Sequence, residues 1–150
     1  MDDAAKSHGK SLRKGRISLP NHAYLVTAVT ALRKPVFISF SSARLAVRCF
    51  LDKDDVVHHA QTQAFVIMPD HIHWLHQLEN DGNLSEAVRL FKAKVSYVLR
   101  QQIWQRGFHD HALRGEEDVR GIARYVIANP LRSGLAKNTG EYPHWDAIWL

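Results

Sequence analysis

Short extended segments and longer helical patterns alternate along this 150-residue chain, and their order restricts the folds that it can adopt. The extended segments are rich in β-branched and apolar residues, as strands are. The helical segments place apolar residues about 3.6 positions apart. The predicted strands cover 23–29, 64–68, 71–78 and 108–113, and the predicted helices cover 41–51, 84–104 and 116–129.

Residues that favour turns and caps mark where these elements begin and end. Ser41 and Ser42 can cap the first helix. The Pro69-Asp70 pair predicts a turn between two strands, and Gly107 is expected to break the long helix. The last helix should stop at Asn129, because Pro130 disfavours helical geometry in the residue before it.

The first six elements run strand-helix-strand-strand-helix-strand. This order matches a ferredoxin-like α+β fold with an antiparallel sheet, and it leaves one extra C-terminal helix, which carries Tyr125. The length suits one domain. We expect the aromatic tail residues Tyr142, Trp145 and Trp149 to pack back onto its core.

The composition excludes several classes of protein. Hydrophobic residues make up 45% of the chain and charged residues 23%, which is ordinary for a globular domain and unlike a disordered one. Cys49 is the single cysteine, so no disulfide can form within the chain. No apolar run reaches the roughly 18–20 residues of a membrane span, and the polar first residues do not resemble a secretory signal. We therefore expect a cytoplasmic protein that does not bind membranes.

The net charge of +5 fits an anionic partner, and part of it lies in the first 22 residues. We interpret 1–22 as a flexible basic arm and 23–150 as the catalytic domain. The arm is either a solvated tail or a contact for phosphates. Its candidate DNA-binding residues are Lys10, Arg13, Lys14 and Arg16.

A second basic cluster lies along the long predicted helix and in the segment after it. Between positions 86 and 114 the sequence contains six basic and two acidic residues, and aromatic residues are interspersed among them. Cations beside aromatic faces suit single-stranded nucleic acid, although an amphipathic helix with a solvated face would show the same pattern. The candidates are Arg89, Lys92, Lys94, Arg100, Arg106 and Arg114.

His71-Ile72-His73 follows an apolar strand directly. Residues two apart on a strand point to the same side, so both imidazoles would project together and could hold a divalent metal ion. A pair of hydrogen-bonded surface histidines is the alternative. A histidine-triad hydrolase is excluded, because position 75 is leucine.

Tyr125 and Asn129 are four residues apart on the last helix and therefore share a face. An amide oxygen can bind a hard metal ion, and a phenol can become a nucleophile when its surroundings activate it. The alternative interpretation is structural: Tyr125 would be a core residue and Asn129 would cap the end of the helix.

Several blocks, in order, resemble the single-tyrosine HUH transposases and most closely their REP-associated members. The blocks are MPDHIHWL (68–75), WQRGFHDHALR (104–114), ARYVIANPLRSGL (123–135) and EYP (141–143), and the likeness covers roughly residues 17 to 145.

The resemblance implies that His71 and His73 hold the metal and that Tyr125 is the nucleophile. Asn129 occupies the place where relatives put an amide that completes the metal site. The arm and the second cluster would hold DNA. The resemblance assigns no role to His109 and His111.

The implied activity is metal-dependent cleavage and rejoining of single-stranded DNA that forms hairpins, such as REP-like palindromes. Mg²⁺ or Mn²⁺ would polarise the scissile phosphate, and Tyr125 would form a 5′-phosphotyrosine link, which makes the chain a DNA strand transferase with endonuclease activity. The resemblance allows either a homodimer or a monomer.

Three other functions remain open at this point. The chain could bind nucleic acid without cleaving it, or it could be a metal hydrolase that uses water while Tyr125 is structural. It could also be an interaction module that needs neither metal nor DNA. The residues His71, His73 and Tyr125, present together, favour the transposase.

Overall fold

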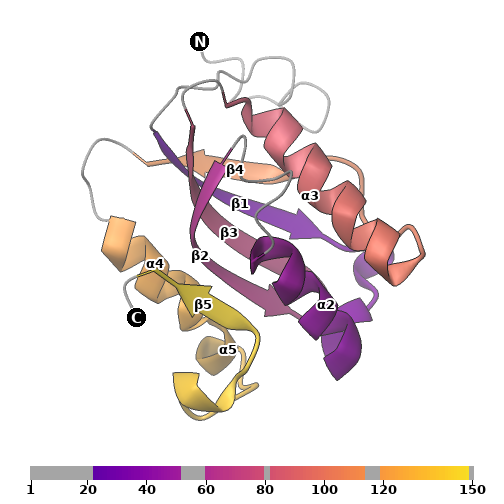
Figure 1. Cartoon of the computed structure of the whole chain (residues 1–150). Helices are drawn as coiled ribbons and strands as arrows, with labels where there is room; N and C mark the ends of the chain where they lie inside the picture. Colours follow the sequence, from indigo (N-terminus) through magenta and orange to yellow (C-terminus); the bar gives the residue numbers. More distant parts are fainter. Residues whose placement is uncertain (1–21, 52–59, 80–81, 114–118, 149–150) are drawn as a thin grey trace.

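A five-stranded antiparallel sheet organises the computed structural model, which describes residues 22–51, 60–79, 82–113 and 119–148 (Figure 1). The strands are β1 (Ala23–Val29), β2 (Ala60–Met68), β3 (His71–Leu78), β4 (His109–Ala112) and β5 (Trp145–Ala147). Their order across the sheet is β4-β1-β3-β2-β5. The central strands β1 and β3 thus come from different parts of the chain, as in a ferredoxin-like sheet, so the predicted α+β fold is confirmed.

Helices cover both faces of this sheet (Figure 1). They are α2 (Phe40–Leu51), α3 (Leu84–Leu99), α4 (Val119–Ile127) and the short α5 (Asn129–Arg132). Short 3₁₀ turns lie at η2 (Ala31–Arg33), η3 (Val36–Ile38) and η5 (Thr139–Glu141). The helices α2 and α3 lie on one side of the sheet, and α4 and α5 lie on the other.

The larger core lies between the sheet and the pair α2 and α3. Alternate residues of β3, among them Ile72 and Trp74, are fully buried on this face. Phe50 of α2 and Phe91 of α3 stack there with ring centroids 4.2 Å apart. Burying this aromatic surface is the main stabilising contribution of the α2 and α3 side.

The second core lies under α4. Its buried residues Ala123 and Val126 pack against the other face of β2 and β3, including Leu75 and Val66. Since strand residues alternate between faces, the odd-numbered residues of β3 point to the α4 side. This places His71, His73 and α4 on the same face of the sheet.

The predicted strands β1 and β3 match the structure to the residue, whereas the long helix was predicted too long. It ends at Leu99, because Arg100 adopts a left-handed conformation (φ 59°) and its N–H bonds back to Ser96 and Tyr97. The chain then places Ile103 in the core and pairs Trp104 with Thr30 as a β-bridge. The helical spacing of apolar residues continued by chance into this loop.

Two helix boundaries also differ from the prediction. The side chain of Ser39, rather than Ser41 or Ser42, accepts a hydrogen bond from the N–H of Ser42 at the start of α2 (3.3 Å). The helix α4 ends at Ile127, and Asn129 begins α5 with Pro130 in its first turn, where a proline is tolerated. Positions 114–118, where the last helix was expected to open, lie outside the described residues.

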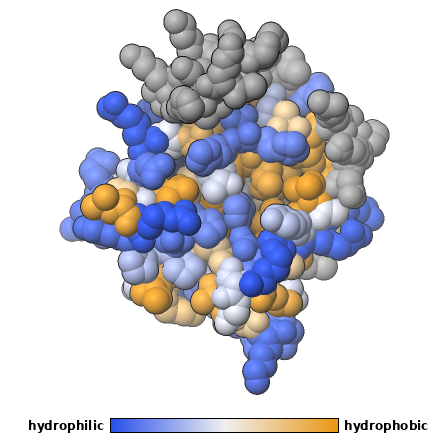
Figure 2. All heavy atoms as spheres, turned by 180° about the vertical axis from the view of Figure 1, so that it is seen from behind, coloured by the Kyte–Doolittle hydropathy of each residue, from blue (hydrophilic) through white to orange (hydrophobic). Residues whose placement is uncertain are grey.

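The C-terminal tail packs as expected but contributes a strand that was not predicted. Tyr142 and Trp145 lie against the second core, and β5 pairs with the edge of β2. Trp149 and the arm up to residue 21 lie outside the described residues. None of the helices in the described part is long and apolar enough to cross a membrane. On the reverse side of the molecule, hydrophobic side chains form separate patches between hydrophilic ones (Figure 2).

Candidate functional site

The two histidines of the HxH motif lie at the start of the central strand β3. Their ring centroids are 4.9 Å apart with the planes nearly perpendicular. His71 Nδ1 lies 2.7 Å from Asp70 Oδ1, and His73 Nδ1 lies 2.9 Å from Thr27 Oγ1 on β1. Because each Nδ1 is engaged, each ring has its Nε2 left for a ligand, which is the usual arrangement behind metal-binding histidines.

The surroundings of His73 keep its ring neutral. Burial, with smaller electrostatic contributions from His71 and Arg132, lowers the pKa of His73 to about 4. At neutral pH the ring therefore has a free lone pair rather than a second proton. A neutral imidazole is the form that binds a metal ion.

These donors fit a divalent ion that also accepts oxygen ligands. Two imidazole nitrogens make an open site, and the remaining positions would be filled by oxygen atoms of water, phosphate or an amide. Within the described ranges, no group of three or more His, Cys, Asp or Glu side chains could hold a metal ion by itself.

Tyr125 lies on α4, the helix that covers this face of the sheet. Its neighbour Val126 is buried against β2, whereas Tyr125 is 56% exposed. The guanidinium carbon of Arg132 lies 3.7 Å from the Tyr125 ring centroid. Arg132 also lowers the pKa of His73, so its charge lies near both the tyrosine and the histidine pair.

Arg132 is a site residue that the sequence analysis missed. It lies beyond the break between α4 and α5, seven positions after Tyr125. Two helical turns separate positions seven apart, and this spacing to a tyrosine was the available signal. The spacing could not show that the chain stays helical past Ala128, which lets the Arg132 side chain reach the ring.

Asn129 does not occupy the predicted end of the last helix, because it is the first residue of α5. It is half-buried, and its Oδ1 lies 3.5 Å from Ser133 Oγ, a long hydrogen bond. This hydrogen bond is with Ser133 and not with either histidine. The metal role of Asn129 stays a prediction.

The second basic cluster separates into structural and exposed cations. Arg89 pairs with Glu86 one turn away on α3. Lys92 donates from Nζ to the carbonyl oxygens of Gln105 (2.9 Å) and Gly107 (2.8 Å). These two residues stabilise α3 and the loop after it.

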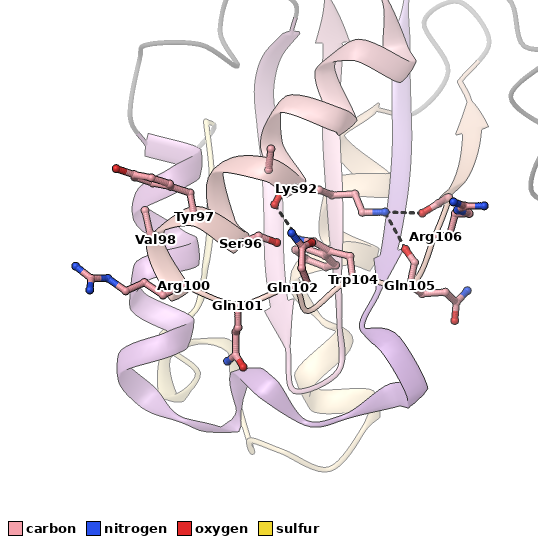
Figure 3. Close-up of a pocket in the computed structure, with 12 residues that line it drawn as sticks. Lys92, Ser96, Tyr97, Val98, Arg100, Gln101, Gln102, Trp104, Gln105 and Arg106 are labelled. Atoms are coloured by element: carbon pink, nitrogen blue, oxygen red, sulfur yellow. Dashed lines mark hydrogen bonds between the residues drawn. The ribbon is translucent and has the colours of Figure 1, made fainter.

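Arg100 and Arg106 are exposed and line an open hollow at the end of α3 (Figure 3). Trp104 forms the centre of this hollow, and its indole N–H donates to the carbonyl of Lys92 (3.0 Å). Lys94 is half-buried. The remaining candidates Lys10, Arg13, Lys14, Arg16 and Arg114 lie outside the described residues.

The second HxH pair lies on the edge strand β4, on the same face as the first. Thr27 of β1 is opposite His73 on one side and opposite His109 on the other. Directly opposed residues point to the same face, so His109, Thr27 and His73 form one row across the sheet. His109 and His111 are exposed.

Comparison with known proteins identifies the family of this chain. The sequence profile of the family described as "Transposase IS200 like" matches residues 18–127, a span that includes both histidines and Tyr125 but not Asn129. The chain belongs to the IS200-like transposase family.

The chain also resembles the REP-associated tyrosine transposases. It is 30% identical over 100 residues to a protein of that name from Haemophilus influenzae, covering 56% of this chain and 57% of the relative. It is 31% identical over 85 residues to the REP-associated tyrosine transposase of Escherichia coli K12, covering 55% and 52%. The matched region spans about half the length of these relatives.

A solved structure of a REP-associated tyrosine transposase bound to a REP hairpin shares the fold. The TM-score is 0.71 at 24% identity, and the match covers 87% of this chain and 79% of that one. The fold predicted from the sequence is thus seen in a second protein.

Proposed function

We propose that this chain cuts and rejoins single-stranded DNA through a covalent bond to Tyr125, with the help of a divalent metal ion. The observation that carries the proposal is that Tyr125 lies on the helix covering the face of the histidine pair, with Arg132 near both. A nucleophile, a pair of candidate metal ligands and a nearby cation are groups that phosphoryl transfer can use.

The metal would be held by His71 and His73 and by oxygen atoms of the substrate, with Asn129 as a further candidate ligand. Mg²⁺ or Mn²⁺ would supply charge neutralisation at the scissile phosphate. Asp70 and Thr27 would orient the two rings, because each engages the Nδ1 atom of one histidine.

The Tyr125 oxygen would attack phosphorus as the bond from phosphorus to the 3′ oxygen breaks. The phenolic proton leaves, and the departing 3′ oxygen takes up a proton from the surrounding water. The products are a 5′-phosphotyrosine link and a free 3′-OH. Since the link is still a phosphodiester, a 3′-OH can reverse the reaction and join a new end.

Arg132 would act as a positioning residue in this step. A guanidinium stacked on an aromatic ring holds the ring in one orientation, and its forked N–H groups suit a phosphate oxygen. The partner would be single-stranded DNA with a hairpin, by analogy with the REP hairpin bound in the related structure. Arg100 and Arg106 are among the exposed cations available to its backbone in the described part of the chain.

The covalent intermediate gives a direct test. The protein is mixed with a hairpin oligonucleotide from its own genomic surroundings, labelled at the 5′ or 3′ end, with Mn²⁺ or Mg²⁺. On denaturing gels, wild type should carry the 3′ label in a protein-sized adduct, and Tyr125→Phe should form none. Tyr97→Phe removes the same hydroxyl from an exposed tyrosine on α3 and should still form the adduct.

Other outcomes would favour the alternative functions. Cleavage without an adduct that persists in Tyr125→Phe would indicate a hydrolase that uses water. Tight hairpin binding without cleavage under either metal would indicate a binding protein of the same fold.

A further inference from the structure

Leu32, in the loop after β1, exposes more of its side chain than the other large hydrophobic residues of the described structure. It is 87% exposed, and its backbone adopts a left-handed conformation (φ 56°). Arg33 follows with φ 55°. Residues other than glycine adopt this conformation at a cost in free energy, and such strain concentrates at functional sites.

The loop is held in this shape by fixed contacts. Thr30 is fully buried, and its hydroxyl lies 2.8 Å from the carbonyl oxygen of Lys34 and 3.0 Å from that of Asp70. The N–H of Ala31 donates to the carbonyl of Ile103 (2.8 Å). The exposure of Leu32 is therefore imposed by an anchored backbone.

The loop adjoins the candidate site through Asp70. Arg33 Nε lies 3.3 Å from Asp70 Oδ2, and the other oxygen of the same carboxylate lies 2.7 Å from His71 Nδ1. The Arg33 side chain is still 61% exposed, and Lys34 is exposed beside it. An apolar side chain is thus followed by two cations, and the first of these contacts Asp70, which precedes a candidate metal ligand.

We infer that residues 31–34 bind the single strand next to the cleavage position, an inference that rests on the proposed function. Leu32 packs against the face of a base, and Arg33 and Lys34 contact the neighbouring phosphates. Leucine side chains act as apolar wedges against bases in other DNA-binding proteins, and cations beside them fix the backbone. Asp70 links this loop to His71, so a strand bound at His71 would lie near Arg33.

The test distinguishes the effect of the Leu32 side chain from the effect of its strained backbone conformation. Leu32→Gly removes the apolar tip and relieves the left-handed strain, whereas Leu32→Ala removes most of the tip and keeps the strain. Ile38→Ala, which truncates another exposed apolar side chain (74% exposed), is the matched control. Each protein is titrated, with anisotropy readout, into a fluorescein-labelled hairpin with and without the single-stranded flank that contains the cleavage position.

Both Leu32 variants should bind the flanked hairpin about fivefold or more weakly than wild type. Their affinity for the bare hairpin should be unchanged, and Ile38→Ala should match wild type on both probes. The melting temperature of Leu32→Gly should equal or exceed that of wild type, which excludes unfolding as the cause.

Wild-type affinity of both Leu32 variants for the flanked hairpin would overturn the inference, and so would equal losses on both probes. If wild type forms the Tyr125 adduct, the proposed function stands in either case. If wild type binds neither probe, the proposed function fails and this inference fails with it.

Discussion

The guanidinium of Arg132 lies 3.7 Å from the centre of the Tyr125 ring, across the break between α4 and α5. The same charge lowers the pKa of His73 on β3. One side chain thus lies near the proposed nucleophile and near a proposed metal ligand. The backbone stays in the right-handed helical region at Ala128, so Arg132 lies about two helical turns after Tyr125 and its side chain reaches back to the ring.

Replacing Arg132 should separate its two effects. Arg132→Ala should slow adduct formation about tenfold or more, because the ring loses its stacked cation and the phosphate loses a donor. It should also raise the pKa of His73 in the metal-free protein, measured by NMR titration of the ring protons. Arg132→Lys keeps the charge but not the planar fork, so it should keep the low pKa and recover only part of the rate. An adduct rate unchanged in Arg132→Ala would show that the contact has no role in the reaction.

Thr27→Val should weaken metal binding without unfolding the protein. The substitution keeps the shape but removes the hydroxyl that lies 2.9 Å from His73 Nδ1. Loss of such a partner typically costs about 10–100-fold in metal affinity. Mn²⁺ binding, followed by electron paramagnetic resonance of the free ion, would measure it.

Thr62→Val is the matched control for that experiment. Thr62 accepts a hydrogen bond from the Trp74 indole on the opposite face of the sheet (2.9 Å). Its loss should lower the free energy of unfolding by about 1–3 kcal/mol, because a buried donor loses its partner, and should leave Mn²⁺ binding intact. Equal Mn²⁺ binding by Thr27→Val and wild type would argue against His73 as a ligand.

Arg100 and Arg106 should contribute to DNA binding through phosphates. Replacing either with alanine should weaken binding to all sequences alike and reduce the dependence of log K on log salt by about one. Arg89→Ala should have a smaller effect, because Arg89 is already paired with Glu86. Titrations of one hairpin at several salt concentrations would provide these slopes, and identical slopes for all three variants would exclude the hollow at the end of α3 as a phosphate site.

Acid should destabilise the protein through His76. This residue is fully buried between Tyr24 and Trp74, and in the described part of the chain neither ring nitrogen has a hydrogen-bond partner. Burial lowers the pKa of His76 from 6.5 to about 3. Between these values the unfolded chain binds a proton that the folded chain does not, so stability is full above pH 6.5 and is lost as the pH falls toward 3.

Urea unfolding at pH 7 and pH 5 would measure this loss. The contribution of His76 should be on the order of 2 kcal/mol over that interval. His76→Leu should reduce the pH dependence and leave the part due to His73, whose pKa is also lowered, whereas replacement of the exposed His111 by glutamine should leave it as in wild type. Equal pH dependence of His76→Leu and wild type would show that His76 is not responsible.

The strand β1 was predictable from the sequence as a short apolar run with β-branched residues, and β3 as the extended segment after a turn. Every second residue of β3 from Ile72 onward is apolar or aromatic except His76, and the turn at Pro69-Asp70 fixes where the strand begins. The end of α3 could not be read in this way. Its apolar spacing continues past Leu99, and only the contacts of Ile103 and Trp104 with other elements show that the chain has left the helix.

The parts of the candidate site that lie on a single strand could be predicted from the sequence. The contacts that depend on the backbone path beyond one regular element could not. The common face of His71 and His73 follows from strand geometry alone. The contact of Arg132 with Tyr125 depends on the chain staying helical past Ala128, and the exposure of Leu32 depends on a backbone conformation that leucine seldom adopts. Local sequence patterns carry neither piece of information.

The histidine pair belongs to a strand that is hydrogen-bonded on both sides, to β1 and to β2. Amide hydrogens in such a position exchange with solvent only when the whole domain opens, because no local fluctuation can free them. The two rings should therefore keep their relative position for as long as the protein remains folded. Tyr125 lies outside the sheet, on the exposed side of α4, and Arg132 holds its ring, so the proposed nucleophile and the metal-binding strand are fixed by separate contacts.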